Sequence, residues 1–168
     1  TSTGNGLCNS ENDNVTITYT ASPTADADID QTVCANNPAV TLSGSVTIAS
    51  GGSWSGGAGT YAPDANTLNA VYTPSAAEIV SGTVTLTLTT TGNATCNSIT
   101  NDMDITITTA PLANADFDQT VCANNPAVTL NGSVTIATGG VWSGGTGTYV
   151  PNANTLNAIY TPSAAEIT

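Results

Sequence analysis

Alternating acidic residues are the part of this chain best suited to binding chemistry. They form two groups at matching spacing, and the set comprises Asp26, Asp28, Asp30, Asp116 and Asp118. A calcium ion takes about six to eight oxygen ligands, and carboxylates are its usual protein ligands. We therefore predict a calcium site at these aspartates. The alternative is a solvated edge strand whose charges discourage pairing with another sheet.

Glu78 and Glu166 are the other carboxylates that occupy matching places in two copies of one motif. Each follows Ser-Ala-Ala, a pattern typical of a serine helix cap with Glu at the third helical position. Acid–base catalysis needs a paired carboxylate or a histidine, and no partner carboxylate is evident. Because the chain contains no His and no Lys, we expect no catalytic residue and no enzymatic activity.

The four cysteines are Cys8, Cys34, Cys96 and Cys122. With no Cys-x-x-Cys spacing and no His, disulfides in an oxidising compartment fit better than a zinc site. The favoured pair, Cys34–Cys96, closes a loop of about 62 residues and would stabilise the fold by roughly 4 kcal/mol. Cys8 and Cys122 would then pair with adjacent repeats or subunits. The alternative scheme is Cys8–Cys34 with Cys96–Cys122, and sequence leaves both schemes open.

These residues belong to a repeat. Residues 31–79 return almost unchanged at 119–167, and residues 3–10 align with 91–98, both at an offset of 88 residues. A repeat of this length is one small domain copied in tandem. We predict that 1–25 is the C-terminal part of a preceding repeat, that 26–113 is a complete repeat, and that 114–168 is the N-terminal part of a following one. The chain is then either a window on a longer protein or a subunit that completes its fold with a neighbour.

Composition excludes several kinds of partner. The 168 residues include no Lys, Arg or His, and the net charge is −12. Nothing in the chain can neutralise phosphates, which excludes nucleic acid and attraction to an anionic membrane surface. No run of about 18 apolar residues occurs, so no direct membrane insertion is expected. Trypsin-like proteases find no cleavage site, which suits a protein exposed outside a cell.

Strand patterns run through the whole repeat. Apolar residues alternate with polar ones at Val84, Leu86 and Leu88, and again at Met103, Ile105 and Ile107, with Val15, Ile17 and Tyr19 at the matching positions of the first fragment. Turn residues separate such runs at intervals of about ten residues, which is typical of a β-sandwich. Trp54 and its copy Trp142 are the large aromatics expected to anchor each core.

Six motifs of the complete repeat carry a resemblance to a known family. They lie at residues 25–34, 40–45, 52–57, 72–79, 82–88 and 91–93. Together they resemble the polycystic-kidney-disease-type (PKD-like) branch of immunoglobulin-like sandwiches. The full set also resembles the tandem repeats of large secreted surface proteins of Bacteroidota, of the adhesin and gliding-motility type. One departure is Asp at positions 28 and 116, where PKD-like repeats commonly carry Gly.

The resemblance covers essentially all 168 residues. It implies an all-β fold of tandem immunoglobulin-like sandwich repeats of about 88 residues, located outside the cell at its surface. The leading hypothesis is a structural segment of an extracellular stalk, filament or adhesin, in which adjacent copies touch end to end. A second is a self-polymerising filament subunit completed by β-strand exchange. A third is an adhesive module for calcium or a glycan, with an unknown surface ligand and no other cofactor.

Overall fold

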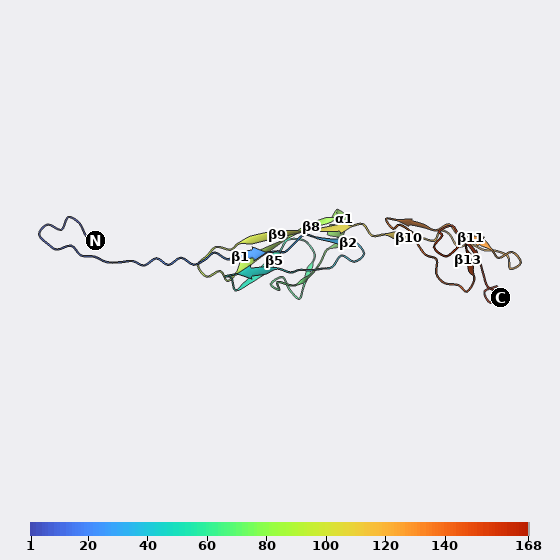
Figure 1. Ribbon diagram of the computed structural model, residues 1–168, viewed down its shortest axis with the longest axis horizontal. Helices are drawn as coiled ribbons and strands as arrows, with labels where there is room; N and C mark the ends of the chain where they lie inside the picture. The colour runs from blue at the N-terminus through green and yellow to red at the C-terminus, as the bar shows by residue number, and fades with distance from the viewer. Residues whose placement is uncertain (168) are drawn as a thin grey trace. The chain divides into compact units, whose positions relative to one another are not determined.

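A computed structural model describes residues 1–167 (Figure 1). Apart from the short helix α1 (Ala76–Ser81), every regular element of these residues is a β-strand, which confirms the all-β prediction. The chain divides into two compact units: the first holds Thr1–Gln31 and Ala39–Ile105, and the second holds Thr32–Pro38 and the residues from Thr106 onward. The predicted boundaries at 25/26 and 113/114 therefore stay a prediction. From the strand bounds, we call residues 24–111 the complete copy and residues 112–167 the following copy.

The complete copy contains the sheets of an immunoglobulin-like sandwich. Its strands are β1 (Thr24–Asp26), β2 (Gln31–Cys34), β3 (Val40–Thr41), β4 (Ser45–Thr47), β5 (Gly51–Ser55), β6 (Thr60–Ala62), β7 (Val71–Thr73), β8 (Thr83–Thr91) and β9 (Thr100–Thr108). One sheet has the order β2-β9-β8-β5, a second has the order β3-β7-β6, and β1 pairs with β4. The antiparallel register of β5 on β8 places Trp54 opposite Leu88.

The core follows from strict alternation along the two long strands. On β8, Val84, Leu86 and Leu88 are buried, and the threonines between them lie at or nearer the surface. On β9, Met103, Ile105 and Ile107 are buried in the same way. Each large apolar side chain removed from water contributes about 1.5–3 kcal/mol. The predicted strands at these six positions are confirmed.

Trp54 lies at the centre of this core, as predicted. Its side chain is 2% exposed, and its indole N–H donates to the Leu68 carbonyl oxygen at 3.1 Å. A Cβ at Gly44 would lie 2.7 Å from the Trp54 ring and 2.9 Å from a Leu88 methyl group. The ring therefore packs directly against glycine backbone, a contact that no larger residue at position 44 would allow.

Helix α1 begins and ends as its sequence indicates. Ser75 is the N-cap, and Glu78 completes a capping box by accepting the Ser75 backbone N–H. Gly82 ends the helix in the left-handed conformation, at φ 80°, which glycine adopts without steric cost. The predicted one-turn helix with a serine cap is thus confirmed.

The following copy repeats this geometry in the second unit. Its strands are β10 (Leu112–Asn114), β11 (Val128–Thr129), β12 (Ser133–Thr135), β13 (Thr148–Val150) and β14 (Ile159–Thr161). The register of β10 on β12 equals that of β1 on β4 with 88 added to every residue number. The three-stranded sheet β11-β14-β13 likewise matches β3-β7-β6.

The expected strand at Val15, Ile17 and Tyr19 is wrong for this chain. No strand is assigned there, and the three side chains are 85%, 68% and 88% exposed. Their counterparts on β9 are buried because β8 pairs alongside them, and the printed sequence holds no counterpart of residues 83–88 before residue 15. The preceding turn does form: Ser2 N–H donates to the Glu11 carbonyl, as Thr90 N–H does to Ile99.

The departure from the PKD-like pattern has a visible cause. Asp28 and Asp116 both adopt the left-handed conformation, at φ 68° and 66°, which is where glycine is usual. Asp tolerates this region better than most residues. The turn is closed by a side chain in each case: Asp28 N–H donates to Asp26 Oδ1 at 3.0 Å, and Asp116 N–H donates to Asn114 Oδ1 at 2.9 Å.

Candidate functional site

A cluster of hydrogen-bonded polar groups surrounds Glu78, and we call it the Tyr–Glu clamp. It joins the loop at Ala58 and Gly59 to Tyr72 on β7 and to Ser75 at the helix cap. Glu78 Oε1 accepts the Ala58 N–H at 2.7 Å and the Tyr72 hydroxyl at 2.8 Å. Oε2 accepts the Ser75 N–H at 2.7 Å and its hydroxyl at 2.8 Å. Both carboxylate oxygens are therefore fully occupied.

The clamp sets the ionisation of its members. Burial tends to raise the pKa of Glu78, but the hydrogen bonds from Ser75, Ala58 and Tyr72 hold it below its usual value. Burial, together with the bond to Glu78, raises the pKa of Tyr72 to about 12. Glu78 therefore stays a charged acceptor and Tyr72 a neutral donor at neutral pH.

The following copy holds the same clamp. Tyr160 donates to Glu166 Oε1 at 2.7 Å, Thr146 N–H donates to the same oxygen at 2.9 Å, and Ser163 N–H donates to Oε2 at 2.7 Å. The Tyr160 hydroxyl and these backbone donors lower the pKa of Glu166 to about 2. A Cβ at Gly57, or at Gly145 in this copy, would overlap the tyrosine hydroxyl, so the clamp depends on glycine in the loop.

The arrangement is structural. A general acid must hold a proton near neutral pH, whereas these carboxylates have lowered pKa values and no free oxygen. The prediction that Glu78 caps backbone amides is confirmed. The tyrosine of the clamp was missed, although the spacing of Tyr72 to Glu78 and the paired glycines before them recur at an offset of 88 residues and could have revealed it.

The five aspartates predicted to bind calcium do not form one assembled site. Asp30 Oδ1 accepts the Asp104 N–H at 2.9 Å, and the Asp26 carboxylate closes its own turn. Asp28, Asp116 and Asp118 are exposed. Within residues 1–167, no group of three or more His, Cys, Asp or Glu side chains is placed to hold a metal ion. Calcium binding stays a prediction.

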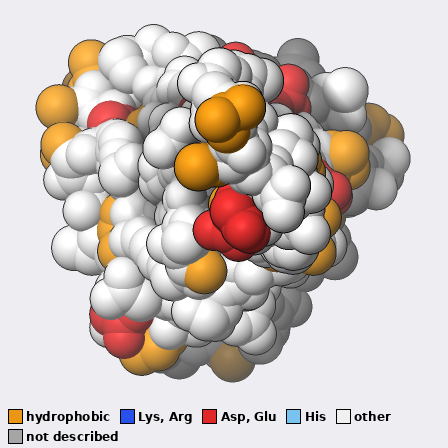
Figure 2. Space-filling model, turned by 90° about the vertical axis from the view of Figure 1, so that its left-hand side faces the viewer, with side chains coloured by type: hydrophobic (Ala, Val, Ile, Leu, Met, Phe, Trp, Pro, Cys, Tyr) orange, Lys and Arg blue, Asp and Glu red, His pale blue; other side chains and the backbone are white. Residues whose placement is uncertain are grey.

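Charge is spread thinly over the surface. Figure 2 shows Asp and Glu side chains at separate places among polar atoms, with hydrophobic side chains scattered between them. Because the sequence has no basic residue, none of these carboxylates pairs with a basic side chain. No helix of the described residues is long and apolar enough to cross a membrane.

All four cysteines are free thiols in the structure, and both pairing schemes of the sequence analysis stay predictions. Cys34 and Cys96 are half-buried, whereas Cys8 and Cys122 are exposed. The Cys34 Sγ lies 4.0 Å from the Thr109 carbonyl oxygen. The Cys96 Sγ lies 3.6 Å from the Ala21 carbonyl oxygen. Each of the two half-buried thiols thus adjoins backbone at an end of the complete copy.

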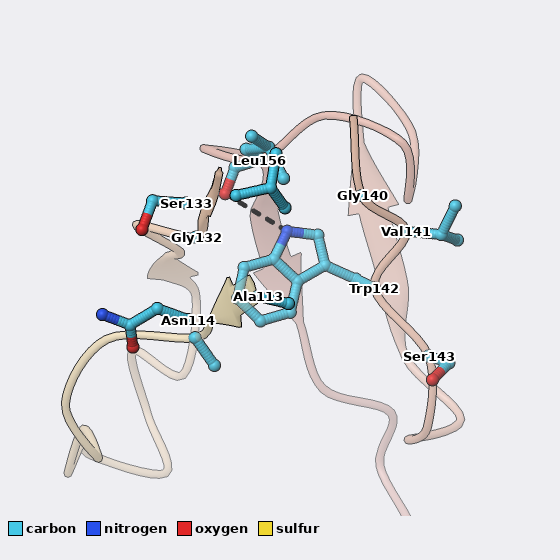
Figure 3. Close-up of a pocket in the computed structure, with 11 residues that line it drawn as sticks. Ala113, Asn114, Gly132, Ser133, Gly140, Val141, Trp142, Ser143 and Leu156 are labelled. Carbon is cyan, nitrogen blue, oxygen red and sulfur yellow. Dashed lines mark hydrogen bonds between the residues drawn. The ribbon is translucent and has the colours of Figure 1, made fainter. Parts of the chain in front are cut away.

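The following copy carries an apolar hollow that we call the open groove. It is a cavity of about 320 Å³ lined by Ala113, Gly132, Val134, Gly140, Trp142 and Leu156, among others. Figure 3 shows the Trp142 ring at its centre, with the indole N–H donating to the Leu156 carbonyl oxygen at 3.2 Å. Trp142 is half-buried, unlike Trp54.

The complete copy shows what belongs in such a groove. There the methyl groups of Leu88 lie 2.9 Å and 3.0 Å from the Cβ positions of Gly44 and Gly52. The corresponding glycines, Gly132 and Gly140, line the open groove. The printed sequence contains no counterpart of β8 after Thr168. In the complete copy the Leu88 side chain of β8 occupies the equivalent place.

Comparisons with known proteins give a distant likeness only. No family model matches the chain, and no curated protein matches it. Among solved structures, it is similar to extracellular cadherin domains 3–6 of Protocadherin Gamma B2, with a TM-score of 0.40, 10% identity, and coverage of 84% of this chain and 39% of that one. It is also similar to extracellular cadherin domains 1–4 of Protocadherin Gamma B7, with a TM-score of 0.35, 12% identity, and coverage of 84% of this chain and 41% of that one.

A third structure, the EC3-6 cis-dimer of Protocadherin gammaB7, has a TM-score of 0.34 at 9% identity, and covers 85% of this chain and 40% of that one. The chain thus spans about two fifths of the length of the structures it matches. At these TM-scores the likeness carries no statement about function, and the resemblance to Bacteroidota surface repeats rests on the motifs alone.

Proposed function

We propose that this chain is a structural repeat segment of an extracellular surface stalk, filament or adhesin. The observation that carries the proposal is that one folded unit recurs at an offset of 88 residues, down to strand register and the Tyr–Glu clamp. Arrays of such units contact their neighbours end to end, and their stability sums over the repeats. The function is then to provide length and stiffness while adhesion itself resides elsewhere.

Surface chemistry supports an exposed, passive role. The absence of Lys and Arg removes every site for trypsin-like proteases, and the net charge of −12 opposes non-specific association. The clamp leaves no free carboxylate oxygen on Glu78 or on Glu166. The free thiols of Cys34 and Cys96, by contrast, lie beside the linkers at the two ends of the complete copy.

The open groove gives the second candidate, a polymerising subunit, a specific basis. A neighbour's exposed Val15, Ile17 and Tyr19 could supply the β9 position of the following copy. Residues 1–25 hold no counterpart of Leu88, however, so that exchange would leave the groove itself unfilled. Covalent continuation of the chain fills both places, and we therefore favour the tandem array.

The size of the native polypeptide tests the proposal. Proteins from cells that make the chain are separated on a denaturing gel with reductant. An antibody raised against the 168-residue chain then detects the band. The tandem array predicts a band far above the 16.6 kDa of these residues. A reduced band near 16.6 kDa would overturn the array and favour the polymerising subunit.

A further inference from the structure

Cys34 stands at the end from which the chain leaves the complete copy. It ends β2 and opens a turn closed by the Asn37 N–H, which donates to the Cys34 carbonyl at 2.8 Å. Ala35 N–H donates to the Thr108 carbonyl at 2.8 Å, which fixes this turn beside the last residue of β9. The Cys34 Sγ therefore reaches the carbonyl of Thr109, the first residue beyond that strand, at 4.0 Å.

Cys96 stands at the end where the chain enters the same copy. It lies in the turn between β8 and β9, where its N–H donates to the Asn93 carbonyl at 3.0 Å. Its Sγ lies 3.6 Å from the carbonyl oxygen of Ala21, which precedes β1. This thiol thus adjoins the linker that arrives from the preceding copy.

Repetition relates the two observations. Ala21 and Thr109 lie 88 residues apart, so they are the same linker position in successive copies. At each junction, the cysteine equivalent to Cys34 in the copy that the chain leaves is therefore expected to approach the linker carbonyl. The cysteine equivalent to Cys96 in the copy that the chain enters is expected to approach the same carbonyl. Where both contacts form at one linker carbonyl, the two sulfurs lie beside the same oxygen atom. We propose that a disulfide joins these two cysteines across every junction between successive copies.

This assignment replaces the pairing Cys34–Cys96 within one copy. The nine residues of β9 lie between the two thiols, since Cys96 precedes its first residue and Cys34 adjoins the residue after its last. An extended strand of that length spans about 30 Å, whereas the Cα atoms of a disulfide lie about 4.4–6.8 Å apart. The alternative Cys8–Cys34 fails as well, because its thiols belong to junctions two repeats apart.

The exposed pair fits the same scheme. Cys8 and Cys122 occupy turns equivalent to those of Cys96 and Cys34: Cys8 N–H donates to Asn5, and Asn125 N–H donates to Cys122. The linker residues that would cover them lie 88 positions before Ala21 and after Thr109, and the printed sequence does not include those positions. All four thiols therefore have partners in other copies.

The bond forms by ordinary thiol–disulfide exchange. One thiolate attacks a small-molecule or protein disulfide and forms a mixed disulfide, and the second thiolate displaces the leaving thiol. Two electrons pass to that oxidant, which is reduced to two thiols, and the two cysteine protons are released or taken up by them. The inference rests on the proposed tandem function, because it requires adjacent copies in one chain.

A two-chain fusion tests it. The chain begins at the equivalent of residue 89 and ends at the equivalent of residue 80, so the sequence of residues 81–88 joins two full chains in register. After treatment with oxidised glutathione, peptide mapping without reductant should find two cross-links. These are Cys34 of the first chain with Cys8 of the second, and Cys122 of the first with Cys96 of the second. The other four cysteines should form no cross-link and should be found as free thiols or as mixed disulfides with glutathione.

Matched variants make the result specific. Cys34→Ser in the first chain should abolish the first cross-link and leave the second intact. The single 168-residue chain should gain no internal disulfide under the same oxidant, and its four cysteines should be found as free thiols or as mixed disulfides with glutathione. A disulfide between Cys34 and Cys96 of one chain would overturn the disulfide between copies. So would the absence of any cross-link in a fusion that is extended in X-ray scattering. Neither result would contradict the proposed stalk. If the maximum dimension of the fusion in X-ray scattering were that of a compact globule, both the proposed stalk and the disulfide between copies would be overturned.

Discussion

Removing one charge from the Tyr–Glu clamp should weaken the complete copy measurably. In Glu78→Gln a single amide oxygen replaces two acceptor oxygens, and the new NH₂ group faces two of the four donors, at Ala58, Tyr72 and Ser75. A hydrogen bond to a charged group contributes about 1.5–3 kcal/mol. Because Glu78 is only half-buried, we expect a loss of about 2 kcal/mol in the free energy of unfolding.

Thermal unfolding followed by circular dichroism measures this loss. For a domain of this size, about 2 kcal/mol corresponds to a Tm lower by roughly 10 °C. Glu166→Gln is the matched control, because it makes the same change in the following copy and should leave the transition of the complete copy in place. A Glu78→Gln Tm within 2 °C of the parent would refute the clamp as a stabilising element.

Acid provides an independent check of the same reasoning. The pKa of Glu78 is lower in the folded chain than its unfolded value of about 4.3. The clamp's contribution is therefore fully present above about pH 4.3 and is lost as pH falls through the folded pKa. The gap between the parent and Glu78→Gln should close as pH falls toward 2. A gap that stays constant between pH 7 and pH 2 would contradict the assignment.

Three further results follow from the packing and charge of the chain. Leu88→Ala should lower the free energy of unfolding, measured by chemical denaturation, by about 2–5 kcal/mol, because it empties the space against Gly44 and Gly52. Leu112→Ala, at an exposed position on β10, is the control and should change that free energy by less than about 0.5 kcal/mol. Ile48 is exposed at φ 65°, a costly conformation for a β-branched residue, so Ile48→Asn should raise the Tm by a few degrees; an unchanged or lower Tm would contradict that strain. Raising NaCl from 10 to 150 mM should raise the Tm, because salt screens a net charge of −12; an unchanged Tm would contradict that repulsion. The same titration tests the predicted calcium site: a larger Tm increase in CaCl₂ than in MgCl₂ at equal ionic strength would support it, and equal increases would contradict it.

Local patterns predicted the fold well where a partner strand exists in the same chain. Alternation identified β8 and β9 and their buried faces, and the Ser75 pattern identified the helix cap. The same alternation failed at Val15, Ile17 and Tyr19, because a strand needs a neighbour as well as a pattern. The alternation of residues predicts which face of a strand would be buried. Only the folded structure shows whether a neighbouring strand covers that face.

Site residues were predicted less well, for a different reason. Glu78 was found because capping is local in sequence, whereas its bonds to Ala58 and Tyr72 arise from packing between loop, strand and helix. The cysteine pairs stay a prediction, because recurrence once per repeat does not say which copy holds the partner. The linker positions beside Cys34 and Cys96 become visible only from the placement of their sulfurs.

X-ray scattering of the two-chain fusion tests the central claim most directly. The maximum dimension of the fusion is compared with that of the single 168-residue chain, under reducing conditions so that no cross-link contributes. Copies arranged end to end predict that the dimension nearly doubles. A compact assembly of twice the length would grow only by a factor of about 1.3, and that result would contradict a stalk.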